Sequence, residues 1–287
     1  METKLVFERE LIFFIKQKPE LSSLDDSFVR GVLLKHVSLS KIVWSKYSSF
    51  EQALRSKSVK HLISVVRRDL RTAYGLYIKQ PLKLSLLDSI SSLDDKNLFS
   101  LLDFHRSTSE RLSLYSSIYT LLFDELFSWG LSKNFSLLDL ACGYNPLAYH
   151  FFPVPPKEYF VSDLSTSDMN FFNSFFEKFG LSAKAFSFDL LSDSFFEWVS
   201  DKSFDLVFLF KALDSFEQVE RHSSKRLLSS IDSSFFVVSF SLVSIGGRSR
   251  IDASKRSWFE SFCDRQSWFF KKLTFSNELF YIVKTFS

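Results

Sequence analysis

Residues 138–146 read Leu-Asp-Leu-Ala-Cys-Gly-Tyr-Asn-Pro, and this stretch indicates the fold class. A short apolar run ends at an acid, and the small residues Ala141 and Gly143 follow it. In an open α/β sheet a ligand binds beyond the carboxyl end of the first strand, where small residues let it approach the backbone. Only one glycine is present, so the stretch lacks the pyrophosphate fingerprint G-x-G-x-x-G. It therefore predicts a strand and a ligand-binding turn without a phosphate cradle.

Two further acids follow the next two strand-like runs. Asp163 lies 20 residues after Gly143, an offset at which a carboxylate can accept both hydroxyls of an adenosine ribose. Asp189 can accept the exocyclic amine of adenine while Leu190 covers the ring. With Asp139 free to hold a cationic or amide group, the acids predict a cofactor that contains adenosine.

Strand-like and helical segments alternate from about residue 135. The strand-like runs are 136–140, 159–162, 184–188, 206–210 and 235–240, and helical spacing occurs over 169–179 and 218–229. Such alternation predicts a parallel sheet with helices on both faces. Two last runs, 267–274 and 278–285, flank Ser276-Asn277 and predict an antiparallel hairpin. The expected fold class is α/β, a doubly wound sheet with a C-terminal antiparallel pair.

The N-terminal part is expected to be an all-helical domain over 1–104, followed by a second domain over 105–287. Helices are predicted over about 4–17 and 25–37. Ser48 with Glu51 fits a capping box and predicts another helix start. The next helix has a buried stripe of Val59, Leu62, Ile63, Val66, Leu70, Ala73, Tyr74 and Tyr77.

The linking segment 105–130 is expected to be one long helix. Ser107 with Glu110 fits a capping box at its start, and Gly130 stops it.

Positive charge is concentrated in the window 28–83, which holds twelve Lys and Arg residues but only Glu51 and Asp69 as acids. Such an excess suits a phosphate backbone. It also suits a solvated helix surface, and the sequence leaves both interpretations open. Lys60, Arg67 and Arg71 fall opposite the buried stripe, which predicts an outward basic ridge. The candidate RNA-binding residues are Lys57, Lys60, Arg67, Arg68 and Arg71.

Composition excludes several classes of protein. Hydrophobic residues make up 46% of the 287 residues and aromatic residues 17%, which excludes global disorder. The scarcity of glycine (7) and proline (6) argues against a turn-dense β-sandwich. Cys142 and Cys263 cannot form a disulfide framework or a zinc site alone, so no metal is expected. No secretory signal or membrane-spanning run occurs, which favours a cytoplasmic protein.

Four motifs resemble one known family. Residues 139–148, Asp-Leu-Ala-Cys-Gly-Tyr-Asn-Pro-Leu-Ala, are similar to the cofactor loop of the aminoglycoside-resistance 16S rRNA (guanine-1405 N7)-methyltransferases. The other three, in family order, are His-Arg-Ser-Thr-Ser-Glu-Arg at 105–111, Leu-Phe-Lys-Ala-Leu at 209–213 with Glu217-Gln218, and Val-Ser-Phe-Ser-Leu-Val-Ser-Ile-Gly-Gly-Arg at 238–248. Ser241 and Ile245 depart from the family's proline and leucine.

The resemblance implies a Rossmann-like class I methyltransferase that moves a methyl group from S-adenosylmethionine to N7 of a guanine in the decoding region of 16S rRNA. Its implied partner is the small ribosomal subunit, and the protein is expected to be a monomer. The implied cofactor residues are Arg111, Asp139, Ala141, Cys142, Gly143, Asn145, Asp163, Asp189, Leu190 and Gln218. Those expected to position the target base are Phe210, Lys211, Ser239, Ser244 and Arg248.

No acid–base residue is expected, because guanine N7 is unprotonated at neutral pH and can attack the sulfonium methyl directly. Arg111 would reach the cofactor carboxylate or, alternatively, form an ion pair with an acid such as Asp139. His105 is interpreted as a structural residue, and Cys142 as a wall of the cofactor loop.

Two alternatives stay open. The first is a methyltransferase for another rRNA nucleotide, a tRNA or a small molecule, although a small-molecule enzyme would not need the basic window 28–83. The second is a non-catalytic rRNA-binding assembly factor, which predicts eroded cofactor residues. Asp139, Gly143, Asp163 and Asp189 are all present, which disfavours the second.

Overall fold

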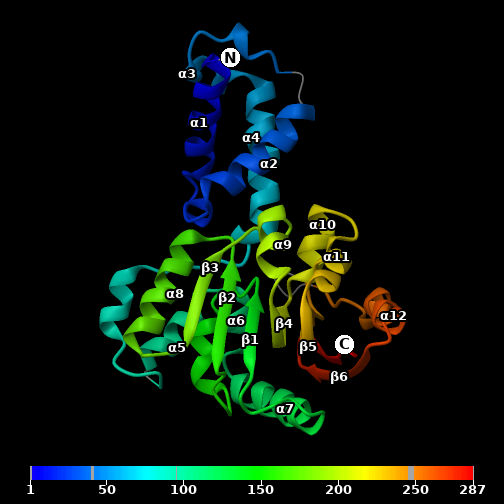
Figure 1. Cartoon of the computed structure of the whole chain (residues 1–287). Helices are drawn as coiled ribbons and strands as arrows, with labels where there is room; N and C mark the ends of the chain where they lie inside the picture. Colours follow the sequence, from blue (N-terminus) through cyan, green and yellow to red (C-terminus); the bar gives the residue numbers. More distant parts are fainter. Residues whose placement is uncertain (1, 40–41, 95, 245–248, 287) are drawn as a thin grey trace.

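The computed structural model describes residues 2–39, 42–94, 96–244 and 249–286. The N-terminal helices stand over one end of a sheet, and further helices cover the two faces of that sheet (Figure 1). Within the described residues, no helix has the length and apolar character to cross a membrane.

The described N-terminal part consists of three long helices, α1, α2 and α4, the six-residue helix α3 and short turns. In chain order the elements are α1 (Glu2–Lys16), η1 (Pro19–Leu21), α2 (Asp26–Leu39), η2 (Trp44–Lys46), α3 (Phe50–Arg55), α4 (Lys57–Leu70) and the π-helical turn η3 (Arg71–Gly75). The helices predicted over 4–17 and 25–37 are confirmed. The predicted apolar stripe is buried in α4, where Val59 and Val66 are fully inaccessible. Beyond Leu70 the regular α-helical spacing gives way to the π-helical turn.

Two predicted helix starts are wrong. The N-cap of α3 is Ser49, whose side chain accepts from the Gln52 backbone N–H at 3.2 Å, whereas the Ser48 backbone donates to the Gln52 side chain. Ser107 does not cap a helix either, because its hydroxyl is hydrogen-bonded to Nδ1 of His105 at 2.9 Å. The N-cap position belongs to His105 itself.

The linking segment contains two helices instead of the one predicted. After η4 (Leu84–Ser89) and α5 (Lys96–Leu102) come α6 (Arg106–Arg111) and α7 (Tyr115–Ser128). The break follows Arg111, whose side chain turns into the interior. Leu82, Leu87, Ile90, Leu98, Leu101 and Leu102 pack into the core of the sheet, whereas the buried core residues of the N-terminal helices end at Tyr74. We therefore propose that the domain boundary lies between Tyr74 and Leu82, and not at residue 104.

The sheet confirms the predicted fold class. Its strands are β1 (Ser136–Leu140), β2 (Glu158–Asp163), β3 (Ala183–Ser187), β4 (Ser203–Phe210), β5 (Asp232–Ser241), β6 (Phe269–Phe275) and β7 (Glu278–Lys284). Their order in the described chain is β3-β2-β1-β4-β5-β7-β6. The pairs among β1 to β5 are parallel, and β7 runs antiparallel to both β5 and β6. The C-terminal hairpin is thus confirmed.

Alternate residues of each strand enter two cores, one on each face of the sheet. Leu206 and Phe208 of β4 belong to one core, and Val207 and Leu209 belong to the other.

The remaining elements are η5 (Asn145–Phe151), α8 (Thr166–Lys178), α9 (Asp193–Val199), α10 (Leu213–Val219), α11 (Ser223–Ser230), η6 (Ala253–Arg256) and α12 (Ser257–Arg265). The single helix predicted over 218–229 is wrong, because the chain turns between α10 and α11 with a positive φ of 69° at His222.

Candidate active site

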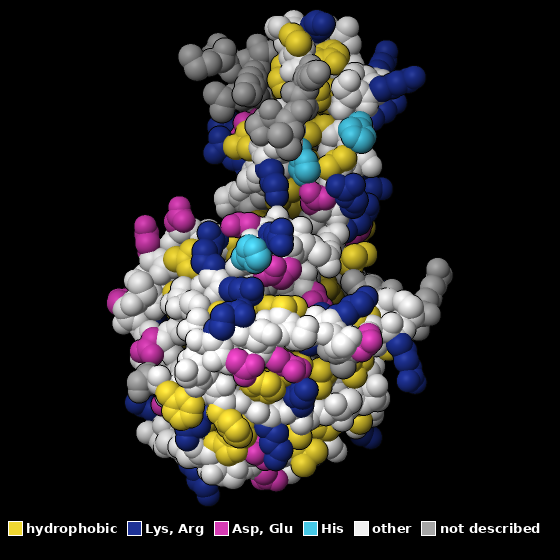
Figure 2. Space-filling view, turned by 90° about the vertical axis from the view of Figure 1, so that its right-hand side faces the viewer, with side chains coloured by type: hydrophobic (Ala, Val, Ile, Leu, Met, Phe, Trp, Pro, Cys, Tyr) yellow, Lys and Arg dark blue, Asp and Glu magenta, His cyan; other side chains and the backbone are white. Residues whose placement is uncertain are grey.

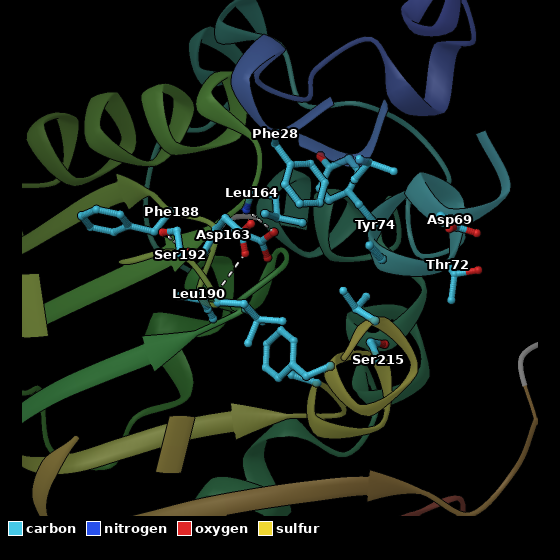
Figure 3. A pocket seen from close by; sticks show the side chains of 18 of the residues that line it. Phe28, Asp69, Thr72, Tyr74, Asp163, Leu164, Phe188, Leu190, Ser192 and Ser215 are labelled. Atoms are coloured by element: carbon cyan, nitrogen blue, oxygen red, sulfur yellow. Dashed lines mark hydrogen bonds between the residues drawn. The ribbon is translucent and has the colours of Figure 1, made fainter. Parts of the chain in front are cut away.

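A cavity of about 1190 Å³ lies between the N-terminal helices and the carboxyl ends of β1 to β4. Figure 3 shows Tyr74 of the N-terminal helices and Asp163 of β2 among the side chains around it. Eight of the predicted cofactor and base-positioning residues line it, and so does Arg68, predicted to bind RNA; the eight are Ala141, Gly143, Asp163, Asp189, Leu190, Phe210, Lys211 and Gln218. The cavity is therefore built where an open α/β sheet binds its ligands.

The turn after β1 brings two of the predicted strand ends together. Ala141 and Gly143 both have positive φ, at 50° and 52°, which folds the backbone back toward β2. The Gly143 N–H then donates to one oxygen of Asp163 at 2.7 Å, and the Leu164 N–H donates to the other oxygen at 2.7 Å. Burial raises the pKa of Asp163, and these two backbone donors oppose that rise. The carboxylate is thus fixed at the cavity wall with lone pairs left for a ligand.

His105 packs directly against Gly143. A Cβ atom at position 143 would lie 2.7 Å from Cε1 of His105, so only glycine fits there. Burial, and then the charges of Arg111 and Lys211, lower the pKa of His105 to about 3. The ring is therefore neutral, stacks on Tyr77 at 5.9 Å, and is hydrogen-bonded to Ser107, which agrees with the structural role expected for His105.

We expect Gly143→Ala to lower the free energy of unfolding by about 2–4 kcal/mol. Two costs sum in this variant: the strain of an alanine backbone in the left-handed region and the steric overlap of its Cβ with His105. Gly180→Ala is the matched control, because φ is +60° there but no described atom lies within 4 Å of the added Cβ. The control is expected to lose about 1 kcal/mol from strain alone. Urea unfolding measures both variants. Equal losses would show that packing against His105 has no energetic consequence.

Asp139, Cys142 and Asn145 lie behind the cavity and are not among the described residues that line it. Oδ2 of Asp139 accepts from Nδ2 of Asn145 at 2.7 Å and from the Tyr159 hydroxyl at 2.9 Å. Oδ1 of Asp139 is fully buried and has no partner among the described atoms. Burial raises the pKa of Asp139 to about 7. Burial also raises the pKa of the Cys142 thiol, which does not suit a nucleophile.

Arg111 forms a buried ion pair with an acid, as the second interpretation expected, but the acid is Glu278 and not Asp139. It makes two hydrogen bonds to Glu278, at 2.9 and 2.7 Å, and does not pair with Asp139. Its guanidinium also stacks 4.9 Å from the centre of the Phe210 ring. The Arg111 side chain is 3% exposed and the Glu278 side chain 1%. In this structure the Arg111 guanidinium therefore binds Glu278, and the contact with a cofactor carboxylate stays a prediction.

Glu278, which no sequence motif indicated, organises the ends of β4 and β5. Nζ of Lys211 lies 3.2 Å from Glu278 and 2.7 Å from Glu110. The Ser239 hydroxyl donates to Glu278 and accepts from the Lys211 backbone N–H at 3.0 Å. Lys211 has a φ of 58° and lines the cavity, whereas Ser239 is fully buried beneath it. The two predicted base-positioning residues are thus linked, but only Lys211 reaches the cavity.

Asp189 and Gln218 line the cavity, whereas Ser244 is not among the described residues that do. Asp189 accepts from the Leu191 N–H at 3.0 Å, and burial raises the pKa of its carboxyl group. Gln218 is exposed on α10. Ser244 is hydrogen-bonded to Ser249 at 3.0 Å in the loop after β5, while Arg248 lies outside the described residues.

Comparison with known proteins identifies the family. Residues 95–282 match the family model described as Ribosomal RNA methyltransferase (FmrO), which is more than half of the chain. The chain belongs to this family. The methyltransferase is 29% identical over 182 residues to a 16S rRNA (guanine(1405)-N(7))-methyltransferase of Frankia casuarinae, covering 63% of this chain and 61% of that protein. A protein of the same name from Micromonospora echinospora is 27% identical over 79% of this chain and 83% of its own length.

The fold agrees with solved structures. The 16S rRNA methyltransferase RmtF, crystallised with S-adenosyl-L-homocysteine, matches with a TM-score of 0.70 over 97% of this chain and 98% of that one. The sequence identity is 20%, so this likeness concerns the fold. The family resemblance and the fold class predicted from the sequence are both confirmed.

The outward basic ridge predicted for the methyltransferase is only partly correct. Lys57, Lys60 and Arg68 are exposed on α4. Arg67 instead is half-buried and donates to the carbonyl groups of Phe14 and Ile15, and Arg71 forms an ion pair with Glu20 at 2.7 Å. These two arginines hold helices together and are not free for RNA. Figure 2 shows Lys and Arg side chains gathered on one side of the N-terminal helices.

Proposed function

We propose that this methyltransferase transfers a methyl group from S-adenosylmethionine to N7 of the guanine in the decoding region of 16S rRNA that its relatives' names designate as 1405. One observation supports the proposal above all. In this member of the ribosomal RNA methyltransferase family, the Gly143 and Leu164 N–H groups hold the Asp163 carboxylate at the cavity wall. The substrate would be the small ribosomal subunit in the cytoplasm.

The described residues fit an adenosine-containing cofactor. Asp163 offers lone pairs to a ribose diol, and Asp189 with Leu190 lies further along the same wall. Asp139 lies behind the lining of the cavity, and its Oδ1 has no partner among the described atoms, so an ammonium group that reached it would be favoured, because a buried carboxylate oxygen without a donor is unfavourable. Gly143 leaves space that a Cβ would fill. When bound, S-adenosylmethionine supplies an electrophilic methyl group.

The protein contributes to the reaction by positioning the guanine against the methyl group and by balancing the charges around the reacting atoms. Guanine N7 needs no general base, and the neutral His105 does not supply one. Methyl transfer makes the purine positive, so a free cation beside it would oppose the reaction. The Lys211 side chain is 7% exposed, and Glu110 and Glu278 neutralise its ammonium group. Lys211 can therefore donate to a base edge without adding net charge at the reacting atoms.

A paired guanine must leave its helix to reach this cavity. We propose that Phe210 and Lys211 hold the flipped base, with Ser239 fixing Lys211 from below. Ser244 and Arg248, in the loop after β5, would contact the RNA around it. The proposal is supported by the position of Phe210 and Lys211 at the cavity wall beside the turn of β1.

Charge reversal on α4 should weaken rRNA binding. We expect the double variant Lys60→Glu/Arg68→Glu to bind 16S rRNA at least about tenfold more weakly, and the salt dependence of log K to flatten by about 0.7–0.9 for each phosphate group that α4 no longer neutralises. The control is Lys133→Glu/Lys157→Glu, whose residues are exposed near the amino ends of β1 and β2. Filter binding at several salt concentrations measures both. An equal loss in the control would show that the effect depends on net charge and not on α4.

The proposed function is tested by offering labelled S-adenosylmethionine with small ribosomal subunits, naked 16S rRNA and tRNA in parallel. Borohydride and aniline cleave RNA at N7-methylguanine, so the product can be mapped. One strong cut in the decoding-region helix supports the proposal. Label in tRNA or at another rRNA nucleotide would retain a methyltransferase and reject the proposed substrate. Cofactor binding without transfer to any of the three RNAs would also reject it, and absence of binding would favour an assembly factor.

A further inference from the structure

The turn that carries Asp163 is held by the N-terminal helices. Leu164 packs against the hydrophobic core of those helices. The Ser165 hydroxyl donates to the Ser23 carbonyl at 3.3 Å, and the Thr166 hydroxyl donates to Asp25 at 3.4 Å. Three consecutive residues after Asp163 therefore contact the other domain.

A buried hydrogen bond completes this contact. The Tyr74 hydroxyl, in the π-helical turn η3, donates to Oδ2 of Asp168 in the first turn of α8. Tyr74 is 5% exposed and Asp168 is 2% exposed. The Ser23 hydroxyl lies 3.1 Å from the same Tyr74 oxygen. Ser165 caps α8 by accepting from the Asp168 N–H at 3.2 Å. The position of Asp168 therefore fixes the start of the helix and the turn that precedes it.

We propose that the N-terminal helical domain is a structural part of the cofactor site, with Tyr74 as a positioning residue that fixes the Asp163 turn through Asp168. The inference rests on the proposed function, because it takes Asp163 as the ribose-binding group. Tyr74 and Phe28 also line the cavity from the helical side, so the same domain both closes the cavity and holds its wall (Figure 3). Cofactor affinity then depends on the N-terminal helical domain, which also carries the candidate RNA-binding residues.

A thermodynamic consequence follows from the same contacts. If the position of the helical domain changes cofactor affinity, then cofactor binding changes the position of the helical domain by the same free energy. The surface that carries Lys57, Lys60 and Arg68 belongs to that domain. If rRNA contacts both domains at once, binding of rRNA and binding of the cofactor are therefore coupled through the Asp163 turn.

The test is Tyr74→Phe, which removes the hydroxyl and keeps the ring. We expect titration calorimetry to show about tenfold weaker binding of S-adenosyl-L-homocysteine, the effect of removing one buried hydrogen bond to a carboxylate. At saturating S-adenosylmethionine, kcat should stay within about twofold while KM for the cofactor rises by about the same factor as Kd. The control is Tyr47→Phe, which loses a hydroxyl bond to Ser56 inside the helical domain and should leave affinity unchanged.

A double-mutant cycle separates positioning from general destabilisation. Asp168→Ala should weaken S-adenosyl-L-homocysteine binding to a similar extent, and the double variant Tyr74→Phe/Asp168→Ala should be hardly weaker than either single variant. Affinity within twofold of the unaltered chain in Tyr74→Phe would overturn the inference, as would additive losses in the double variant. No binding by the unaltered chain would instead overturn the proposed function and, with it, this inference.

Discussion

Replacing Asp163 by alanine is expected to weaken S-adenosyl-L-homocysteine binding by about 10²–10⁴-fold, since two charge-assisted hydrogen bonds to a ribose contribute about 1.5–3 kcal/mol each. The carboxylate also receives the Gly143 and Leu164 N–H groups, so its removal loosens the turn after β1 as well. Affinity for 16S rRNA should remain, because the exposed cations of α4 are unchanged. Calorimetry with S-adenosyl-L-homocysteine and filter binding with rRNA measure the two properties separately.

Asp193→Ala is the matched control for that variant. Asp193 is an exposed aspartate at the start of α9, and among the described residues the cavity lining includes its neighbours Ser192 and Ser194 but not Asp193 itself. The control should bind S-adenosyl-L-homocysteine as tightly as the unaltered chain. If Asp163→Ala lost less than tenfold in affinity, the ribose would have to be held by other residues and the assignment of Asp163 would be wrong.

Glu278→Ala is expected to lower the free energy of unfolding by about 3–5 kcal/mol, because it leaves buried cations without their carboxylate. Arg111 would lose both of its hydrogen bonds to Glu278, and Lys211 would retain only Glu110. For a chain of this size the melting temperature should fall by about 10 °C. Thermal and urea unfolding near neutral pH measure the effect.

The pH dependence gives a second readout for Glu278. Burial by itself would raise the pKa of this carboxyl group, but Arg111 and Lys211 outweigh burial and lower it below its usual value near 4.5. A lowered folded-state pKa contributes stability above the unfolded pKa, and that stability is lost as the pH falls through the folded pKa. The difference between the unaltered chain and Glu278→Ala should therefore shrink in acid.

Glu125→Ala is the control for the buried pair. Glu125 forms an ion pair with Lys271 at 2.6 Å, but the Lys271 side chain is 49% exposed, so its loss should change stability by less than about 1 kcal/mol. A Glu278→Ala variant as stable as this control would show that the buried network is not needed for folding.

Local sequence patterns predicted much of the molecule because their causes are local. Strands buried on both faces are apolar runs, so β1, β2, β3, β4, β5 and the hairpin were found close to their true bounds. The turn at 141–143 was found because positive φ and close packing require small residues there. The capping pairs at Ser48 and Ser107 failed because each serine had a nearer partner, Gln52 in one case and His105 in the other.

The amino-acid sequence was sufficient to predict the α/β fold, the family, and the line of acids and small residues along the strand ends. Only the tertiary structure showed which charged side chains are paired within the protein and which are exposed. Arg111 pairs with Glu278 across 167 positions, Arg67 binds the carbonyl groups at the end of α1, and Tyr74 reaches Asp168 across the domain contact. A buried charge or hydroxyl takes whichever partner the assembled elements bring within hydrogen-bonding distance, because burial without a partner is costly. That partner lies far away in the chain and leaves no periodicity or spacing to be recognised.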